Sequence, residues 1–402
     1  MPRTKHRETY SFKSAFSGSH GSWSDIESQL REVTVIVRRI LVPLTIGNDS
    51  GVRRTVVRSS TCLPLSMTVL LLLTWLFLPS TRVLGREAEV LSLQTHIQLP
   101  GVKGRIDHFS VDIKGDRLFV AAVENHTLEV IDLKSGKRVH TITDLAEPQG
   151  VYYDSSTNKL FVACGLDGVT KVFDATTFRV LTTVKFPDDA DNIRYDPRTK
   201  GVIVGYAGAK QLRKRETGTG GLGFIDSSGQ KTGDVVIDAH PESFQLERAG
   251  SRIFVNVPDK KEIEVIDAVN RSILARWPVS ADDNFPMALD EAQHRLFIGV
   301  WKPPQVLVFD TDTGKQVAAG EIAGKTDDLF YDASRHRVYV LTAEGYLEVF
   351  AETEGRHYSR IARYPTPAGS QTGLFVPEWG RLFVAVPARG KKSAEVRVYQ
   401  AR

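Results

Sequence analysis

The sequence predicts an all-β protein: a seven-bladed β-propeller of four-stranded blades, closed by an N-terminal strand that completes the last blade. Two series of repeated motifs predict this fold, one built around an acid after each first strand and one around an aspartate after each third strand. The third observation is that the chain ends one strand short of a full last repeat. Helical periodicity is absent, which argues against a helical repeat protein.

The first series of motifs sets the period of the repeat. A short apolar segment ends in an acid, a polar turn follows, and a β-rich triplet such as Leu118-Phe119-Val120 comes next. Successive acids are 42, 42, 51, 43 and 42 residues apart, which is the length of a propeller blade. The copy at Leu374-Phe375-Val376 lacks the acid. The acids are Asp112, Asp154, Asp196, Glu247, Asp290 and Asp332.

The second series confirms the period and predicts the hairpins. Two apolar residues precede an aspartate, as in Val130-Ile131-Asp132, and Ser135-Gly136-Lys137 then follows. An aspartate carboxylate accepts hydrogen bonds from turn N–H groups, and glycine tolerates a positive φ, so this pairing is typical of a hairpin. The other aspartates are Asp174, Asp226, Asp267 and Asp310.

The two ends of the repeat region complement each other. The last repeat supplies three strands before the chain ends at Arg402, and residues 90–99 form a further strand-like segment before the first repeat. Pairing this segment with the last blade would remove two exposed sheet edges, which otherwise promote aggregation. We therefore expect the N-terminal strand to close the ring.

These repeats resemble those of the bacterial YVTN-type β-propeller family, whose WD40-like blades carry the same acid–turn–[Leu/Ile/Val]-[Phe/Tyr]-Val and apolar–apolar–Asp strings. The resemblance covers about residues 90–402. It implies an extracytoplasmic propeller related to lactonase-like propellers. Members of such families include binding proteins and lactonase-like hydrolases, so the resemblance predicts the fold more closely than the function.

Residues 1–85 are predicted to be a leader, and residues 86–402 the propeller. The uncharged apolar run Met67–Leu78 is short for a membrane span and suits a signal peptide at about 57–85, with cleavage after Gly85. An uncleaved membrane anchor is the alternative. Residues 1–56 are either a mis-annotated start or a real extension. Export predicts a periplasmic or secreted protein with no membrane span in its mature domain.

Composition excludes several classes of function. Residues 1–85 hold 11 Lys/Arg and 5 Asp/Glu, whereas residues 86–402 hold 41 and 43, so the folded domain lacks the positive charge of a nucleic-acid binder. Cys164 is the one cysteine of that domain, which excludes a CxxC metal site and predicts a buried, inert thiol. The basic insertion at 207–222 is either a solvated loop or a contact for an anionic surface.

The candidate site lies where the loops lead into the first strands, at one mouth of the central channel. The residues five positions before each marker acid form one ring of side chains, and those four positions before it form a second. Four acids fall in the first ring, with a histidine and an asparagine in the second. The ligand or channel-mouth candidates are Asp107, His108, Gln149, Asp191, Asn192, Glu242, Asn284, Asp327, Asp328 and Gln371.

Several carboxylates facing one channel repel one another unless some are protonated or a cation binds. Ca²⁺ or another divalent cation is the candidate cofactor, since it takes carboxylate and amide oxygens. The alternative is that these acids are ordinary loop residues or turn caps. The candidate metal ligands are Asp107, Asp191, Asn192, Glu242 and Asp328.

Two functions follow from this reasoning, besides a quinone-cofactor propeller dehydrogenase, which is disfavoured because its repeating tryptophan motif is missing. The first is a monomeric, non-catalytic propeller that binds an unknown small molecule or protein. The second is a metal-dependent lactonase or esterase-type hydrolase in which His108 acts as general base. A structural role for His108 is the alternative to catalysis.

Overall fold

The computed structural model describes residues 89–208, 219–353 and 357–402. The chain divides into two units, Met1–Val83 and Leu84–Arg402, and all described residues belong to the second. The leader and most of the basic insertion lie outside the described residues. Across the described ranges, no helix is long and apolar enough to span a membrane.

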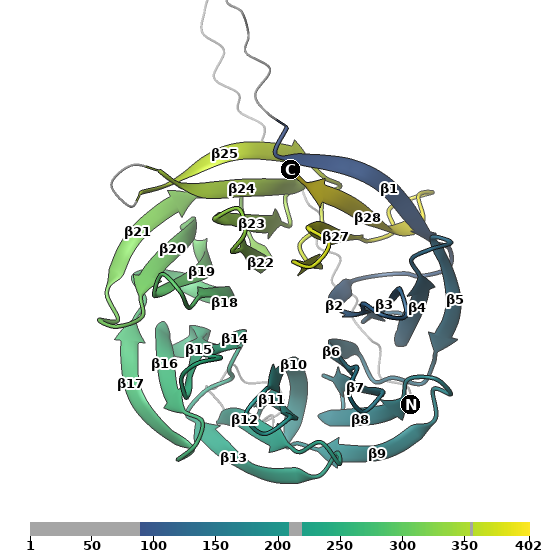
Figure 1. The fold of residues 1–402 in the computed structure, drawn as a ribbon, viewed down its shortest axis with the longest axis horizontal. Helices are drawn as coiled ribbons and strands as arrows, with labels where there is room; N and C mark the ends of the chain where they lie inside the picture. The colour runs from purple at the N-terminus through teal and green to yellow at the C-terminus, as the bar shows by residue number, and fades with distance from the viewer. Residues whose placement is uncertain (1–88, 209–218, 354–356) are drawn as a thin grey trace, which may run out of the picture. The chain divides into compact units, whose positions relative to one another are not determined.

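The described residues form seven four-stranded antiparallel sheets arranged as a ring (Figure 1). Blade 1 contains β2 (Ile106–Asp112), β3 (Arg117–Ala122), β4 (Thr127–Asp132) and β5 (Lys137–Ile142). Blade 2 contains β6 (Pro148–Asp154), β7 (Lys159–Cys164), β8 (Val169–Asp174) and β9 (Val180–Lys185). Blade 3 contains β10 (Asp188–Asp196), β11 (Gly201–Ala207), β12 (Gly220–Ile225) and β13 (Lys231–Ile237). In each, the strands pair in chain order from the centre outward.

The remaining blades follow the same plan. Blade 4 contains β14 (Phe244–Leu246), β15 (Arg252–Val257), β16 (Glu262–Asp267) and β17 (Ser272–Pro278), with a 3-10 turn at Pro258–Lys260. Blade 5 contains β18 (Asp282–Asp290), β19 (Arg295–Lys302), β20 (Pro304–Asp310) and β21 (Gln316–Glu321). Blade 6 contains β22 (Thr326–Asp332), β23 (Arg337–Thr342), β24 (Tyr346–Thr353) and β25 (His357–Pro365). Blade 7 contains β26 (Gly373–Val376), β27 (Arg381–Val386), β28 (Ala394–Ala401) and β1 (Leu91–Leu99).

Strand β1 closes the ring by completing blade 7. It pairs antiparallel with β28, from Leu91 opposite Ala401 to Leu99 opposite Ala394. Leu91 and Leu99 are fully buried and Ile97 is 2% exposed, so the strand contributes to the core as well as to the hydrogen-bond ladder. The predicted seven-bladed propeller fold, with its N-terminal strand in the last blade, is confirmed.

The marker acids stabilise the turns that end the inner strands. Asp112 accepts a hydrogen bond from the Gly115 N–H at 2.9 Å and forms an ion pair with Arg117 at 2.8 Å. Arg117 also donates to the Ala175 carbonyl oxygen of blade 2. The same arrangement joins Arg252 of blade 4 to the Thr311 carbonyl of blade 5. These repeated residues therefore stabilise turns and link neighbouring blades.

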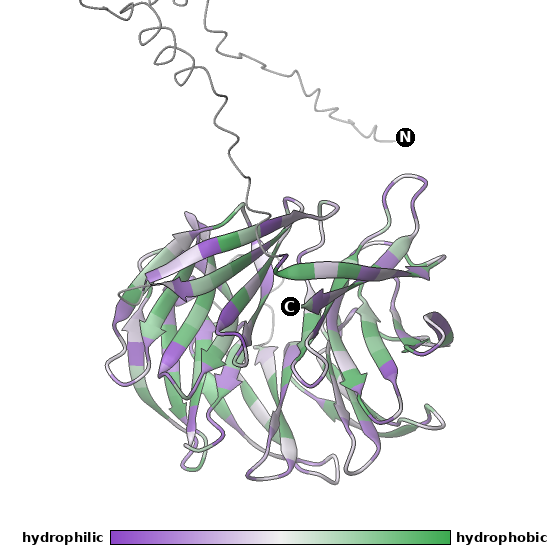
Figure 2. Cartoon of the chain, turned by 45° about the horizontal axis from the view of Figure 1, so that its top comes forward, coloured by the Kyte–Doolittle hydropathy of each residue, from purple (hydrophilic) through white to green (hydrophobic). Residues whose placement is uncertain are grey.

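Within the described ranges the core consists of seven apolar clusters, each shared by two neighbouring blades. The phenylalanine of a triplet illustrates this: Phe119 of blade 1 packs with Leu160 and Val162 of blade 2. Cys164 belongs to the same cluster, and burial raises its pKa to about 12, so the prediction of a buried, inert thiol holds. Figure 2 shows hydrophobic and hydrophilic residues mixed along the strands.

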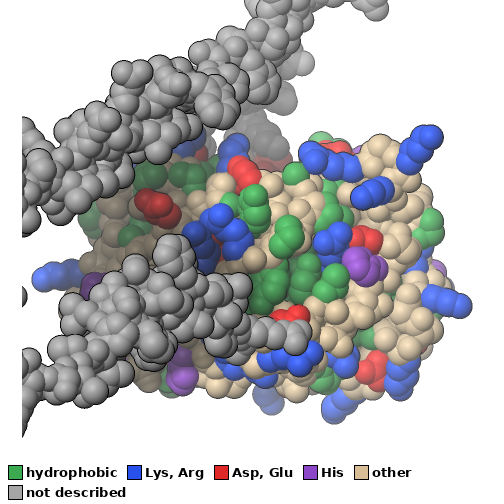
Figure 3. Space-filling view, turned by 90° about the horizontal axis from the view of Figure 1, so that it is seen from above, with side chains coloured by type: hydrophobic (Ala, Val, Ile, Leu, Met, Phe, Trp, Pro, Cys, Tyr) green, Lys and Arg blue, Asp and Glu red, His purple; other side chains and the backbone are tan. Residues whose placement is uncertain are grey.

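The outer strands mix apolar and charged side chains on their exposed faces. Val139 on β5, Leu274 on β17 and Val317 on β21 are 58%, 55% and 47% exposed. Figure 3 shows hydrophobic side chains interspersed with Lys, Arg, Asp and Glu on one side of the ring. Single exposed apolar residues of this kind are normal on a soluble surface.

Candidate functional site: a cavity and an acid ring in the central channel

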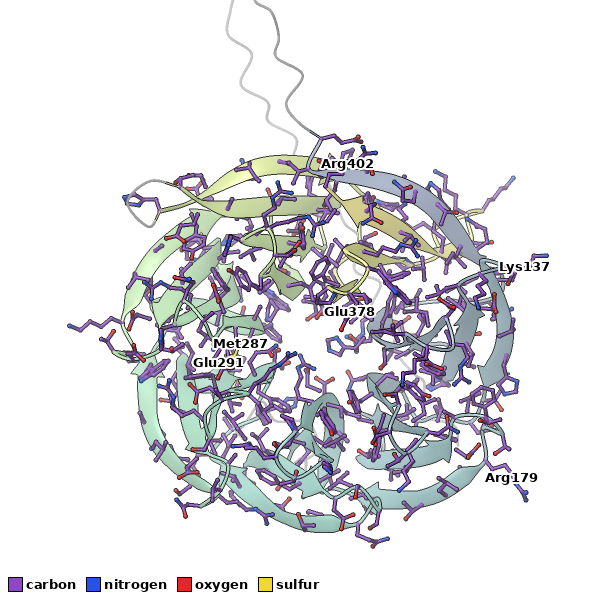
Figure 4. All side chains as sticks on the ribbon, viewed as in Figure 1. Lys137, Arg179, Met287, Glu291, Glu378 and Arg402 are labelled. Carbon is purple, nitrogen blue, oxygen red and sulfur yellow. The ribbon has the colours of Figure 1, made fainter. Side chains whose placement is uncertain are left out.

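The central channel holds a cavity of about 960 Å³ whose walls come from the seven innermost strands. It extends from His108 and Asp328, near the start of their strands, to Lys114, Arg248 and Glu378, just past the end of theirs. The last three are exposed, so the cavity opens where the inner strands end. Figure 4 shows Glu378 beside the centre of the ring, whereas Arg179 lies at its periphery. Sequence reasoning expected ligands at the opposite mouth.

Aromatic and aliphatic side chains line much of this cavity. Tyr152 of β6 and Tyr195 of β10 are stacked, with ring centroids 5.4 Å apart and an interplanar angle of 13°. Phe330 and Leu374 line it from blades 6 and 7. Tyr152, Phe330 and Leu374 stand at equivalent repeat positions, two residues before the marker acid or its counterpart, so the repeat itself places them in one ring.

His108 and Asp328 form an ion pair at the inner end of the cavity. The His108 Nδ1 atom lies 3.4 Å from Asp328 Oδ2, and Nε2 lies 3.8 Å from Asp107 Oδ1. Asp328 also accepts the Gly373 N–H at 2.9 Å. Burial alone would lower the pKa of His108, but the carboxylates of Asp328 and Asp107 outweigh it and raise that pKa to about 10. This raised pKa favours the imidazolium form at neutral pH, and an imidazolium cannot accept the proton that a general base must take.

Arg194 also lines the cavity and was missed by sequence reasoning. Its Nη1 group donates to the Ile193 carbonyl at 2.9 Å and its Nη2 group to Ser243 Oγ at 3.3 Å. Its guanidinium carbon lies 5.7 Å from the centre of the Phe244 ring. Within the described part of the chain, no carboxylate forms an ion pair with Arg194, and burial lowers its pKa. The signal in the sequence was a basic residue at the repeat position where Tyr152 and Phe330 stand.

The acid ring lies at the other mouth, just before the inner strands reach the cavity. Arg105 stands among its members: Nη1 lies 3.0 Å from Asp107 Oδ2 and 3.9 Å from Asp327 Oδ2. Its Nη2 group donates to Gln149 Oε1 at 2.7 Å, and Gln149 donates in turn to Asp189 Oδ1 at 2.9 Å. One guanidinium thus connects blades 1, 2 and 6.

The carboxyl groups of Asp191, Asp327 and Glu242 at this mouth have raised pKa values. Burial raises the pKa of Asp191 to about 7, with His108 and Arg105 opposing and Asp107 and Asp189 reinforcing the effect. Burial and Asp107 raise the pKa of Asp327 to about 6, against the effect of Arg105. Burial, then Asp191, raise the pKa of Glu242 well above its ordinary value. Burial and mutual repulsion therefore favour the protonated forms of these three carboxyl groups.

The structure brings most of the predicted site residues together. Gln371 donates to Asp327 Oδ2 at 3.0 Å, and Asn192 donates to Asp191 Oδ2 at 3.3 Å, so both belong to the acid ring. Asn284 stands apart, because it is buried against Asn256 Oδ1 and the Glu262 carbonyl, each 3.0 Å away. The contributors that sequence reasoning missed are Arg105, Asp189 and Arg194.

The predicted metal ligands do not form a cation-binding cluster by geometry. Among the residues that the structure describes, no group of three or more His, Cys, Asp or Glu side chains is arranged to hold a metal ion. Arg105 supplies the counter-charge for Asp107, and His108 supplies it for Asp328. These residues therefore fit a divalent cation poorly, and ion binding stays a prediction.

Comparison with known proteins shows the fold and no family. No protein-family model matches the chain, and no curated protein matches it. By contrast, 1688 chains of solved structures match, so the fold is too common to select a function. One is a chain in the crystal structure of the mitotic checkpoint complex, with a TM-score of 0.64 and 11% identity over 88% of this chain and 99% of that chain. This likeness shows the propeller fold alone, and membership of the YVTN family stays a prediction.

Proposed function

We propose that the protein is a binding propeller whose central cavity takes a small organic ligand. The observation that carries this proposal is the cavity itself, at about 960 Å³. Pockets that bind small molecules have volumes of about 300–1,000 Å³, with largely apolar walls and a few convergent polar groups. The stacked Tyr152 and Tyr195 supply such walls, and His108 and Arg194 supply polar groups toward the inner end.

The depth of the cavity favours a small molecule over a folded partner. From His108 to the end of β2 at Asp112 the wall follows the strand for four steps of about 3.3 Å, or roughly 13 Å, and it continues to Lys114 in the turn. A folded protein could cover the mouth without reaching Arg194. Protein interaction through the outer surface remains compatible with the fold, and it would leave the cavity free.

The alternative of a metal-dependent hydrolase has weaker support. It needs a neutral His108 to take a proton, yet the ion pair with Asp328 favours the charged form. It also needs a metal, and the nearby carboxylates already pair with cations of the chain. A lactone panel separates the two functions, because hydrolysis that is lost in His108→Ala would favour the enzyme.

Export completes the proposal. The apolar run Met67–Leu78 and the charge contrast between residues 1–85 and 86–402 support a cleaved leader. A periplasmic or extracellular location would suit a protein that captures small molecules from its surroundings.

The test uses N-phenyl-1-naphthylamine, a neutral dye that fluoresces in apolar pockets, with the full-length protein. We expect saturable binding at one dye per chain, and loss of binding in Leu374→Trp, whose indole would occupy the cavity. Val317→Trp on the outer strand β21 is the matched control and should bind as the wild type does. Binding that Leu374→Trp leaves unchanged would refute the cavity as the site.

A further inference from the structure

More basic than acidic side chains face the cavity. Lys114, Arg194, Arg248 and His108 line it, against Asp328 and Glu378. At the inner end Asp328 is already engaged by His108 and the Gly373 N–H. Arg194 therefore remains as a guanidinium whose charge no carboxylate in the described ranges neutralises by direct contact.

Arg194 is held in position before any ligand arrives. Hydrogen bonds to the Ile193 carbonyl and Ser243 Oγ use two of its five N–H donors, and the Phe244 ring lies beside it. A guanidinium presents its donors as a planar fork that matches carboxylate, sulfonate or phosphate oxygens. Because the group is half-buried, a charge-assisted hydrogen bond to it would be little weakened by water.

The acid ring behind the cavity opposes the entry of an anion, and two cations of the chain offset part of its charge. Arg105 forms an ion pair with Asp107 and lies near Asp327, and His108 forms an ion pair with Asp328. Asp191 is the other carboxylate whose charge acts on Arg194, and no ion pair joins the two in the described chain. An acidic ligand group at Arg194 would thus meet a guanidinium that no carboxylate of the described chain contacts directly.

The walls between Arg194 and the mouth determine the rest of the ligand. The stacked pair of Tyr152 and Tyr195, together with Phe330 and Leu374, offers ring faces and aliphatic surface. Aromatic and aliphatic groups gain from burial against such walls. Lys114 and Arg248 at the exposed mouth add attraction for an approaching anion.

We infer that the ligand is an amphipathic organic anion, with its acidic group on Arg194 and its aromatic or aliphatic body between the tyrosine and Phe330–Leu374 walls. This inference rests on the proposed function, since it names the ligand class of the same cavity. Lys114 and Arg248 guide the anion inward, and Arg194 selects for the charge.

The test compares two dyes that share one skeleton. The fluorescent 1-anilinonaphthalene-8-sulfonate is N-phenyl-1-naphthylamine with an added sulfonate, so their ratio of Kd values isolates the contribution of the anion. We expect the sulfonate to bind the wild-type chain roughly 10- to 100-fold more tightly, as a charge-assisted hydrogen bond would provide. Arg194→Gln should weaken binding of the sulfonate far more than binding of the neutral dye, and so remove most of that preference.

Two further variants keep the result interpretable. Arg194→Lys retains the charge and should retain part of the preference, whereas Arg179→Gln removes an exposed guanidinium at the periphery and should change nothing. Equal affinity for both dyes, or a preference that survives in Arg194→Gln, would overturn the inference while the cavity remains a binding site. The proposed function itself would be refuted if neither dye bound, or if Leu374→Trp left the binding of both dyes unchanged.

Discussion

The His108–Asp328 ion pair provides the most direct test of the electrostatics at the inner end of the cavity. We consider Asp328→Asn, which removes the negative charge and keeps an oxygen that can accept the Gly373 N–H. The N···O separation is 3.4 Å, which corresponds to about 5 kcal/mol at an effective dielectric constant of about 20. At about 1.4 kcal/mol for each unit of pKa, this attraction is worth about 3.5 units, and with the attraction of Asp107 it outweighs burial and raises the His108 pKa from 6.5 to about 10.

The variant should therefore lower the His108 pKa by about 3, since Asp107 remains and burial continues to oppose the charged form. The effect on stability has a definite sign. A histidine whose pKa is raised by folding stabilises the protein fully below its ordinary pKa of 6.5 and loses that contribution as the pH rises to about 10. At pH 6 we expect Asp328→Asn to lower the free energy of unfolding by roughly 3–5 kcal/mol. At pH 10 the difference should have largely disappeared.

Two measurements check this prediction. Proton NMR of the histidine ring follows the titration of His108, whose resonance is identified by its absence in His108→Gln. Urea unfolding of the wild type and Asp328→Asn at pH 6 and pH 10 gives the free-energy difference. A wild-type His108 that titrates near 6.5, or a free-energy difference that does not change with pH, would refute the reasoning.

Three other predictions test the ring, the acid mouth and the leader. Deletion of residues 88–99 removes a strand with three buried aliphatic side chains, whose burial is worth about 5–9 kcal/mol together. The Tm measured by circular dichroism should therefore fall steeply. An unchanged Tm would contradict closure of the ring by this strand. If the acid mouth binds Ca²⁺, excess of about 100-fold over Kd should add about 2.7 kcal/mol of stability and raise the Tm, and Asp191→Asn should abolish the rise. A Tm that no divalent ion alters would mean that the side-chain cations of the protein suffice to balance the charge of these carboxylates. In a bacterial host the mature N-terminus should lie near Arg86, and soluble cytoplasmic protein that retains residues 1–85 would exclude export.

The sequence by itself determined the architecture, because its signals are local and repeated. The hairpin aspartates show this: Asp174 accepts hydrogen bonds from the Thr176 and Thr177 N–H groups within its own turn. Strand patterns and turn residues act over a few positions, so they can be read along the chain without knowledge of distant contacts. Repetition then aligned Asp107 with Asp327 in one ring, which is why most candidate residues were found together.

The tertiary structure alone decided which end of the channel holds the cavity and how the charges are paired. His108 and Asp328 are 220 residues apart in the chain and meet because blades 6, 7 and 1 converge at the closure of the ring. Arg105 precedes its strand, outside both aligned rings, yet its long side chain reaches Asp107 and Gln149. Arg194 differs in charge from its equivalents in the other repeats, but only the folded structure shows that it lines the cavity with no carboxylate in direct contact. Coulomb energy depends on distances across the channel, and those distances exist only once the seven blades have closed.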